Sequence, residues 1–226
     1  MGNCSSNKPD NFNIEEEYRK LNLPMPDPTA FENGFEKEAF FTANVFRHNP
    51  KLLIPVIKEV KSKFFHLHNY NNIDDKIHYK GKSWSQLVKE IDKIEEGALQ
   101  MIGLDTYAIQ ACRENNEKIV AENKEDPEIG GNEEAYKKIL GSQQKSGSVD
   151  EGTYIAWGGN GMDMVIMNLI QEYEAFTNPK KGDKKAATPA LLDPLTIKMG
   201  VSFKAHKKTE NIAQLLYVRQ YGNAIE

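Results

Sequence analysis

Residues 152–172, GTYIAWGGNGMDMVIMNLIQE, constrain the fold of this chain more than any other stretch. A short run of β-branched and aromatic residues leads into the glycines of GGNG, and an apolar helix pattern begins at Met162. Strand, glycines and helix in this order are typical of phosphate-binding loops. GGNG matches neither G-x-G-x-x-G nor G-x-x-x-x-G-K-[ST], however, and no lysine or serine follows its last glycine. The glycines are therefore predicted only to turn the chain, with Asp163 at the positive end of a core helix.

The periodicity of the whole chain predicts an α+β fold of about four helices and two or three strands. Proline disfavours helix in the residue before it, so the long first helix is expected to break at Asn49-Pro50. Ser83 is predicted to cap the next helix, whose buried face comprises Trp84, Leu87, Val88, Ile91 and Ile94. The expected helices cover 35–65, 84–100, 106–122 and 135–140, and the closing strands 196–206 and 212–221. This order lacks β-α-β alternation, which excludes a doubly wound nucleotide-binding sheet.

The charge and the cysteine content exclude several classes of protein. The net charge of −4 and the pI of about 5.8 provide no basic field that would recruit nucleic acid. No apolar run approaches the roughly 18 residues that would span a bilayer, and residues 1–30 contain no apolar core of a secretory signal peptide. Cys4 and Cys112 cannot build a disulfide framework, so a cytoplasmic protein is expected. Abundant asparagine and lysine suggest an AT-rich protist genome.

The N-terminus carries a lipidation pattern. MGNCSS places Gly2 and Ser6 where N-myristoylation requires them, and Cys4 where a palmitoyl chain is often added. One myristoyl chain binds membranes weakly, so the second chain would make the anchor stable. The three prolines of LPMPDPT (23–29) enforce an extended chain. Residues 1–29 are therefore expected to form an extended arm with two candidate lipidation sites, and residues 30–226 to form one domain.

Four phrases follow one another in an order that is typical of one family. They are ANVFRHNPKLLIPVIKEV (43–60), YIAWGGNGMDMVIMNLIQE (154–172), LLDPLTIKMGVSF (191–203) and LLYVRQYG (215–222). In this order they resemble the CAP superfamily, also called the SCP, pathogenesis-related-1-like or cysteine-rich secretory protein family. The resemblance implies an α-β-α sandwich, in which about four helices flank a small antiparallel sheet. Residues 30–226 are therefore expected to form a CAP-like domain.

The chain departs from this family at the positions that the resemblance marks as functional. The family places two histidines and two acidic residues around a cleft that can bind a divalent metal. Where the family has its two histidines, this chain has Gly131-Asn132 and Ala186-Ala187-Thr188. Where the family has a glutamate, it has Thr153. Asparagine, alanine and threonine cannot replace imidazole and carboxylate as metal ligands. No metal, cofactor or catalytic residue is therefore expected.

The remaining histidines do not form a recognisable site. His66 and His68 could chelate a metal only on an extended chain, because positions two apart diverge on a helix. His48, His78 and His206 lie far apart in the sequence and are predicted to lie on the surface.

The other reactive or bulky side chains are assigned structural roles. Cys112 lies among apolar residues and is predicted to be a buried thiol rather than a nucleophile. The acidic cluster of Asp92, Glu95 and Glu96 is predicted to be a solvated helix face. Trp84 and Trp157 could line a lipid groove, although two core tryptophans are the ordinary outcome.

A non-catalytic role follows from these patterns. The chain is expected to act as a CAP-like structural or interaction component of an intracellular assembly, such as a protist ciliary axoneme with its microtubules. Its partners would be proteins, among them tubulin or axonemal proteins, and no nucleic acid. The alternative is a myristoylated and palmitoylated adaptor, tethered to the cytoplasmic face of a membrane, with the lysines of 180–185 adding weak attraction to anionic lipid. A metal-dependent hydrolase with a rearranged site is the third reading.

Overall fold

The computed structural model describes seven stretches of the chain: 12–60, 81–123, 131–141, 149–155, 160–179, 187–208 and 210–220. The helices are α1 (Ile14–Lys20), α2 (Gly34–His48), α4 (Gly81–Lys93), α5 (Thr106–Glu122), α6 (Asn132–Leu140) and α7 (Gly161–Thr177), and residues 54–60 are also helical. Short 3₁₀ turns cover Pro28–Ala30 (η1), Pro50–Leu53 (η2) and Ala190–Leu192 (η4). The strands are β1 (Gly103–Leu104), β2 (Val149–Ile155), β3 (Thr196–His206) and β4 (Glu210–Arg219). The predicted α+β class is confirmed.

The four strands form one sheet in the order β1-β3-β4-β2. β3 and β4 make a hairpin, and β2 pairs antiparallel with the other side of β4. The two-residue strand β1 instead pairs parallel with β3, so the predicted antiparallel sheet is wrong at this edge. A parallel partner needs a long connection, and here α5, α6 and α7 all lie between β1 and β3 in the sequence.

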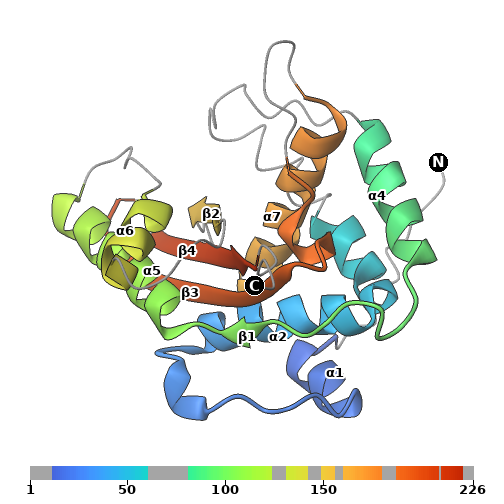
Figure 1. Cartoon of the computed structure of the whole chain (residues 1–226), viewed down its shortest axis with the longest axis horizontal. Helices are drawn as coiled ribbons and strands as arrows, with labels where there is room; N and C mark the ends of the chain where they lie inside the picture. The colour runs from blue at the N-terminus through green and yellow to red at the C-terminus, as the bar shows by residue number, and fades with distance from the viewer. Residues whose placement is uncertain are drawn as a thin grey trace, which may run out of the picture.

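Helices cover both faces of this sheet (Figure 1). Side chains alternate along a strand, so Gln214 and Leu216 of β4 face α5 and α6, whereas Leu215 and Tyr217 join the core under α2 and α7. The larger core cluster includes residues of α1, α2, α4 and α7, and a smaller one lies between α5, α6 and β4. The sheet therefore separates two apolar layers.

Helix α7 is the core helix that the glycine-rich stretch predicts. Every residue from Gly161 to Ile170 is buried, and the helix begins one residue earlier than expected, after the N-cap Asn160. Gly161 lies so close to α2 that an added Cβ would come within 2.2 Å of the carbonyl oxygen of Phe35. Gly161, the last glycine of GGNG, therefore allows α7 to cross α2 at close distance. Residues 156–159, which include the other two glycines, lie outside the described residues.

The N-terminal segment differs from the expected arm. From Phe12 on, residues 12–23 do not extend away from the domain but form α1 and pack on the core. Ile14 and Tyr18, one turn apart, are buried, and the ring centroid of Tyr18 lies 4.3 Å from that of Phe41 in α2. Phe12, Leu21 and Leu23 pack on the same core cluster and help to hold the short helix against α2. Residues 1–11 lie outside the described residues.

Two boundaries around α4 also differ from the prediction. α4 includes Gly81, so Ser83 lies inside the helix and is not its cap. The helix ends at Lys93 rather than near residue 100, because Gly97 adopts a positive φ of 75° and donates to the carbonyl oxygen of His48 at 2.7 Å. Leu87 and Ile91 are buried as predicted, and the side chain of Trp84 lies outside the described part. The break at Asn49-Pro50 is confirmed.

Candidate functional site

The place where a phosphate would bind in a glycine-rich loop is occupied by the chain itself. A carboxylate oxygen of Glu38 in α2 accepts a hydrogen bond from the backbone N–H of Gly161 at 2.9 Å. The side chain of Asn160 accepts another from the N–H of Asp163 at 2.8 Å. The N-terminus of α7, which carries a partial positive charge, therefore has an internal anionic partner. Gly161 is the first residue of α7, and the prediction that Gly158 and Gly159 turn the chain falls on residues outside the described part.

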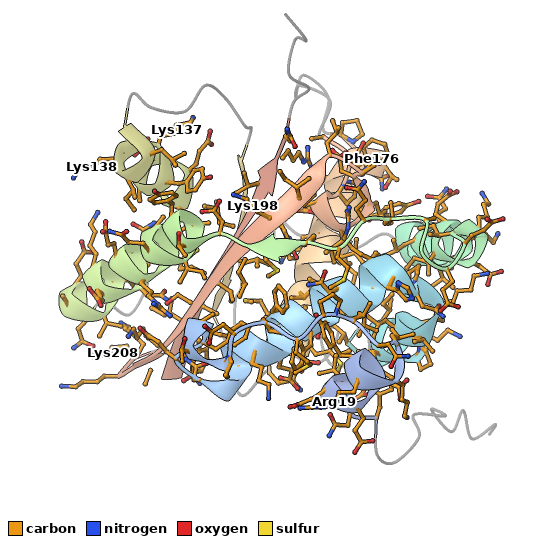
Figure 2. All side chains as sticks on the ribbon, turned by 60° about the horizontal axis from the view of Figure 1, so that its bottom comes forward. Arg19, Lys137, Lys138, Phe176, Lys198 and Lys208 are labelled. Atoms are coloured by element: carbon orange, nitrogen blue, oxygen red, sulfur yellow. The ribbon has the colours of Figure 1, made fainter. Side chains whose placement is uncertain are left out.

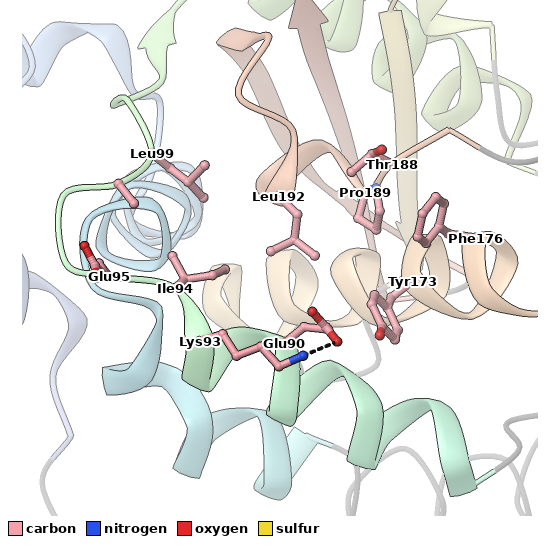
Figure 3. A pocket seen from close by; sticks show the side chains of 11 residues that line it. Glu90, Lys93, Ile94, Glu95, Leu99, Tyr173, Phe176, Thr188, Pro189 and Leu192 are labelled. Atoms are coloured by element: carbon pink, nitrogen blue, oxygen red, sulfur yellow. Dashed lines mark hydrogen bonds and ion pairs between the residues drawn. The ribbon is translucent and has the colours of Figure 1, made fainter.

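A groove lies on another side of α7, between this helix, residues 188–192, and α4 with the segment 94–99 that follows it (Figure 3). It encloses about 630 Å³, and ligand pockets typically enclose roughly 300–1,000 Å³. Figure 3 shows Ile94, Leu192 and Tyr173 around the open space, with Glu95 at its outer edge. The larger apolar side chains that line it are Ile94, Leu99, Tyr173, Phe176, Pro189 and Leu192.

The buried guanidinium of Arg47 in α2 connects the two walls of this groove. Its side chain is fully buried and donates only to backbone carbonyl oxygens: Gln100 at 2.5 Å, Leu191 at 3.3 Å, Asp193 at 2.7 Å and Thr196 at 3.1 Å. Gln100 follows Leu99, which lines one wall of the groove. Leu191 and Asp193 flank Leu192, which lines the opposite wall. Burial lowers the pKa of Arg47 to about 10, so the side chain stays charged at neutral pH. One side chain therefore fixes the distance between the walls.

Two further side chains hold the walls in place. Asn44, one turn before Arg47, accepts from the N–H of Ile102 at 2.8 Å and donates to the carbonyl oxygen of the same residue at 3.1 Å. Glu172 of α7 accepts from the N–H of Ala190 at 2.7 Å. Buried hydrogen bonds of this kind are costly to break. The groove is consequently a formed feature of the fold.

Charged side chains line one side of the groove. Glu90 and Lys93 form an ion pair at 2.9 Å, with half or more of each side chain exposed. Glu95 is exposed and has no ion-pair partner among the residues that the structure describes. The pKa of the Tyr173 hydroxyl is raised by burial and, to a lesser extent, by the negative charge of Glu90. The lining is therefore apolar with a net negative charge.

Two of the three positions that match the CAP family's metal-binding residues meet at Gln214. Asn132 is fully buried, accepts from Asn115 at 2.7 Å and donates to Gln214 at 2.8 Å. Thr153 lies directly opposite Gln214 in the register of β2 and β4. The third position does not join them, because Thr188 lies at the groove and its carbonyl oxygen accepts from Arg219. Asn132 and Thr153, which the resemblance would align with metal ligands, carry an amide and a hydroxyl rather than an imidazole or a carboxylate.

The burial of Cys112 agrees with the prediction, whereas that of one described histidine does not. Cys112 is fully buried, as predicted. His48 is 29% exposed beside Glu96, but His206 is 4% exposed, so its predicted surface position is wrong. Even-numbered residues of β3, such as Ser202, face α5, and His206 continues this face. His66, His68 and His78 lie outside the described residues.

No cluster of three or more histidine, cysteine or acidic residues that could hold a metal occurs in the described stretches. Exposed basic side chains lie at separate corners of the molecule: Figure 2 shows Arg19, Lys208 and the pair Lys137 and Lys138 far apart. Asp92, Glu95 and Glu96 are exposed, as predicted, but only Asp92 lies on a helix, because α4 ends at Lys93. Gly2, Cys4, Trp157 and the lysines of 180–185 lie outside the described residues.

The residues that build the groove were not identified as such from the sequence. Asn44 and Arg47 occur in the phrase ANVFRHNP, which carries the family resemblance, and their spacing of three places them on one helix face. Asn44 and Arg47 are polar residues in a largely apolar stretch of helix, and this pattern could have indicated buried side chains that bond to another segment. The backbone acceptors lie more than fifty residues away in the sequence, and no local pattern predicts them.

Comparison with known proteins gives no relative for this chain. No protein-family model, no curated protein and no solved structure matches it. Among the described helices, none is long and apolar enough to cross a membrane.

Proposed function

We propose that this chain is a non-catalytic interaction domain of CAP-like architecture, which binds a segment of a partner protein in the groove between α4, α7 and residues 188–192. The observation that carries the proposal is the set of four carbonyl bonds of Arg47, which hold the groove open at a fixed width. A preformed groove avoids the cost of ordering its walls when a partner binds.

The packing of the phrases that resemble the CAP superfamily supports the architecture. Arg47, from the first phrase, donates to the carbonyl oxygens of Leu191 and Asp193 in the third. The helix of the second phrase packs on α2, and the strand of the third pairs with that of the fourth. The four phrases are therefore neighbours in space, as they would be in a common fold.

The chemistry of the buried amides supports a non-catalytic role. Asn132 and Gln214 bond to each other between the sheet and α6, and neither can act as a general acid or base at neutral pH. The groove is lined by two carboxylates, one lysine and one tyrosine. One of these carboxylates, Glu90, is already paired with Lys93. An apolar groove with few polar groups is suited to recognition.

Site-specific photocrosslinking tests this function. A benzophenone amino acid replaces Leu192, which lines the groove, or Leu195, which is 42% exposed and lies outside the lining. Each protein is irradiated in extract from the native source. Each captured partner is then purified, and its affinity is measured for wild type, Leu192→Gln and Leu195→Gln.

We expect a partner that crosslinks from position 192, with an affinity that falls at least tenfold for Leu192→Gln and stays unchanged for Leu195→Gln. Tubulin or an axonemal protein at this position would support the proposed assembly in a cilium. A partner that binds both variants equally well would overturn the groove as the binding site.

A further inference from the structure

We propose that the occupant of the groove is a cationic, amphipathic peptide segment, in which a lysine or arginine that faces Glu95 lies beside bulky apolar residues. This inference rests on the proposed function and names the chemistry of the partner. It follows from three features of the lining: its apolar surfaces, its aromatic pair and its net charge.

The apolar surfaces lie on both walls. Ile94 and Leu99 come from the segment after α4, and Leu192 comes from the opposite wall (Figure 3). Each is only partly buried in the folded chain. Covering such surfaces with apolar side chains removes them from water and so stabilises a complex. The partner must therefore supply at least one bulky apolar side chain to each wall.

An aromatic pair forms part of the α7 wall. Tyr173 and Phe176 are three residues apart, so they lie on the same face of the helix. Figure 3 shows Glu90 of α4 beside Tyr173. The two rings offer the partner apolar surface, and their faces also attract a cation that lies over them.

The net charge of the lining distinguishes a cationic partner from an anionic lipid. Glu90 and Glu95 contribute two negative charges, and Lys93 contributes one positive charge that already pairs with Glu90. Glu95 is the carboxylate available to an incoming cation. A fatty acid or an acidic phospholipid would bring a second negative charge beside it, and like charges repel. The groove therefore favours a basic peptide over an anionic lipid.

Selection from a phage-displayed library of random seven-residue peptides tests this inference with the full chain. Ala98 lines the groove and is exposed, so Ala98→Trp fills the space without removing a buried side chain. Ala121 is an exposed alanine of α5 outside the lining, and Ala121→Trp is the matched control. Peptides that bind wild type and Ala121→Trp but not Ala98→Trp are groove-dependent.

The charge is tested on the selected peptides by fluorescence anisotropy. Glu95→Lys reverses the available carboxylate, and Asp92→Lys reverses an exposed carboxylate of α4 that does not line the groove. We expect peptides with lysine or arginine beside leucine or phenylalanine, and a roughly tenfold loss of affinity for Glu95→Lys only.

The outcomes separate this inference from the proposed function. Groove-dependent peptides that are neutral or acidic, or that bind Glu95→Lys as well as wild type, would overturn the cationic partner and leave the groove as a binding site. A selection that gives no groove-dependent peptide would overturn both.

Discussion

The carboxylate of Glu38 accepts a hydrogen bond from the backbone N–H of Gly161 at 2.9 Å and thereby closes the N-terminus of α7. Helix N-termini attract anions because their first N–H groups are unpaired and their dipoles add up. In glycine-rich phosphate loops the anion comes from a ligand, whereas here it comes from α2. The same contact joins the two helices that lie side by side under the sheet.

Replacing Gly161 by alanine should destabilise the protein strongly. The new Cβ would lie 2.2 Å from the carbonyl oxygen of Phe35 and 2.6 Å from the nitrogen of Ala39, so the two helices must separate. We expect the free energy of unfolding to fall by about 3 kcal/mol, measured by urea denaturation. Gly34→Ala is the matched control, because nothing lies within 4 Å of its added Cβ. Equal stability of the two variants would contradict this helix crossing.

Replacing Arg47 by methionine should destabilise the fold and loosen the groove. The substitution leaves four carbonyl oxygens without their donor, and we expect a loss of about 3 kcal/mol or more. Hydrogen exchange should also become faster at Ile102 and in residues 190–196. Arg19→Met, which removes a largely exposed ion pair with Glu15, should cost less than about 1 kcal/mol. Unchanged exchange in both walls would show that Arg47 does not set their spacing.

The buried hydroxyl of Tyr18 should make stability fall at alkaline pH. Burial raises the pKa of Tyr18 to about 12 in the folded protein, against about 10 in an unfolded chain. Between these values the unfolded state releases a proton that the folded state retains. The contribution of Tyr18 to stability is therefore complete below pH 10 and is lost, by up to about 2 kcal/mol, as the pH rises towards 12.

Unfolding by urea from pH 8 to 11.5 measures this effect in wild type and Tyr18→Phe. At pH 8 the variant should be less stable by about 1 kcal/mol, because it lacks the 2.7 Å bond to the carbonyl oxygen of Pro24. Towards pH 11.5 the difference should vanish or reverse. Two curves that stay parallel would contradict a raised pKa, and with it the burial of α1 against α2.

Helices and strands whose apolar residues recur at helical or alternating spacing could be predicted from the sequence. The expected helix over 106–122 and the strand over 196–206 agree with α5 and β3 at both ends. In α7 the apolar residues after Gly161, interrupted only by Asp163 and Asn168 up to Ile170, predict a buried helix. In each case the signal lies within the element, because side-chain alternation or helical spacing alone determines which face is buried.

Elements whose position depends on distant partners could not be predicted. The end of α4 depends on Gly97, which is held by the carbonyl oxygen of His48, and the parallel strand β1 depends on pairing with residues 198–199. α1 contains too few apolar residues for a helix prediction and is stabilised by Phe41. The groove combines three segments that are remote in the sequence, so its residues were predicted as core or solvent-facing positions rather than as one site.

Lipidation of Gly2 and Cys4 remains a prediction of the sequence pattern. Cells that express the full chain are fed alkyne analogues of myristate or palmitate, and labelling is followed by click chemistry and mass spectrometry. We expect Gly2→Ala to abolish both labels and Cys4→Ser to abolish the palmitate label alone, since one acyl chain must bring the thiol to the membrane. Cys112→Ser is the control, because this thiol is buried. Absence of label from wild type would contradict the prediction.

The buried amide of Asn132 should contribute more to stability than any exposed residue of the same helix. It is fully buried and bonds to both Asn115 and Gln214, so Asn132→Ala removes the amide acceptor of the half-buried Asn115 and the donor to the buried Gln214. Each loss of this kind costs roughly 1–3 kcal/mol, and we expect a fall of about 3 kcal/mol in the free energy of unfolding. Glu134→Ala, at an exposed position of α6, should stay within about 0.5 kcal/mol of wild type. If both variants unfold at the same urea concentration, the hydrogen bonds of Asn132 do not stabilise the contact between β4 and α6.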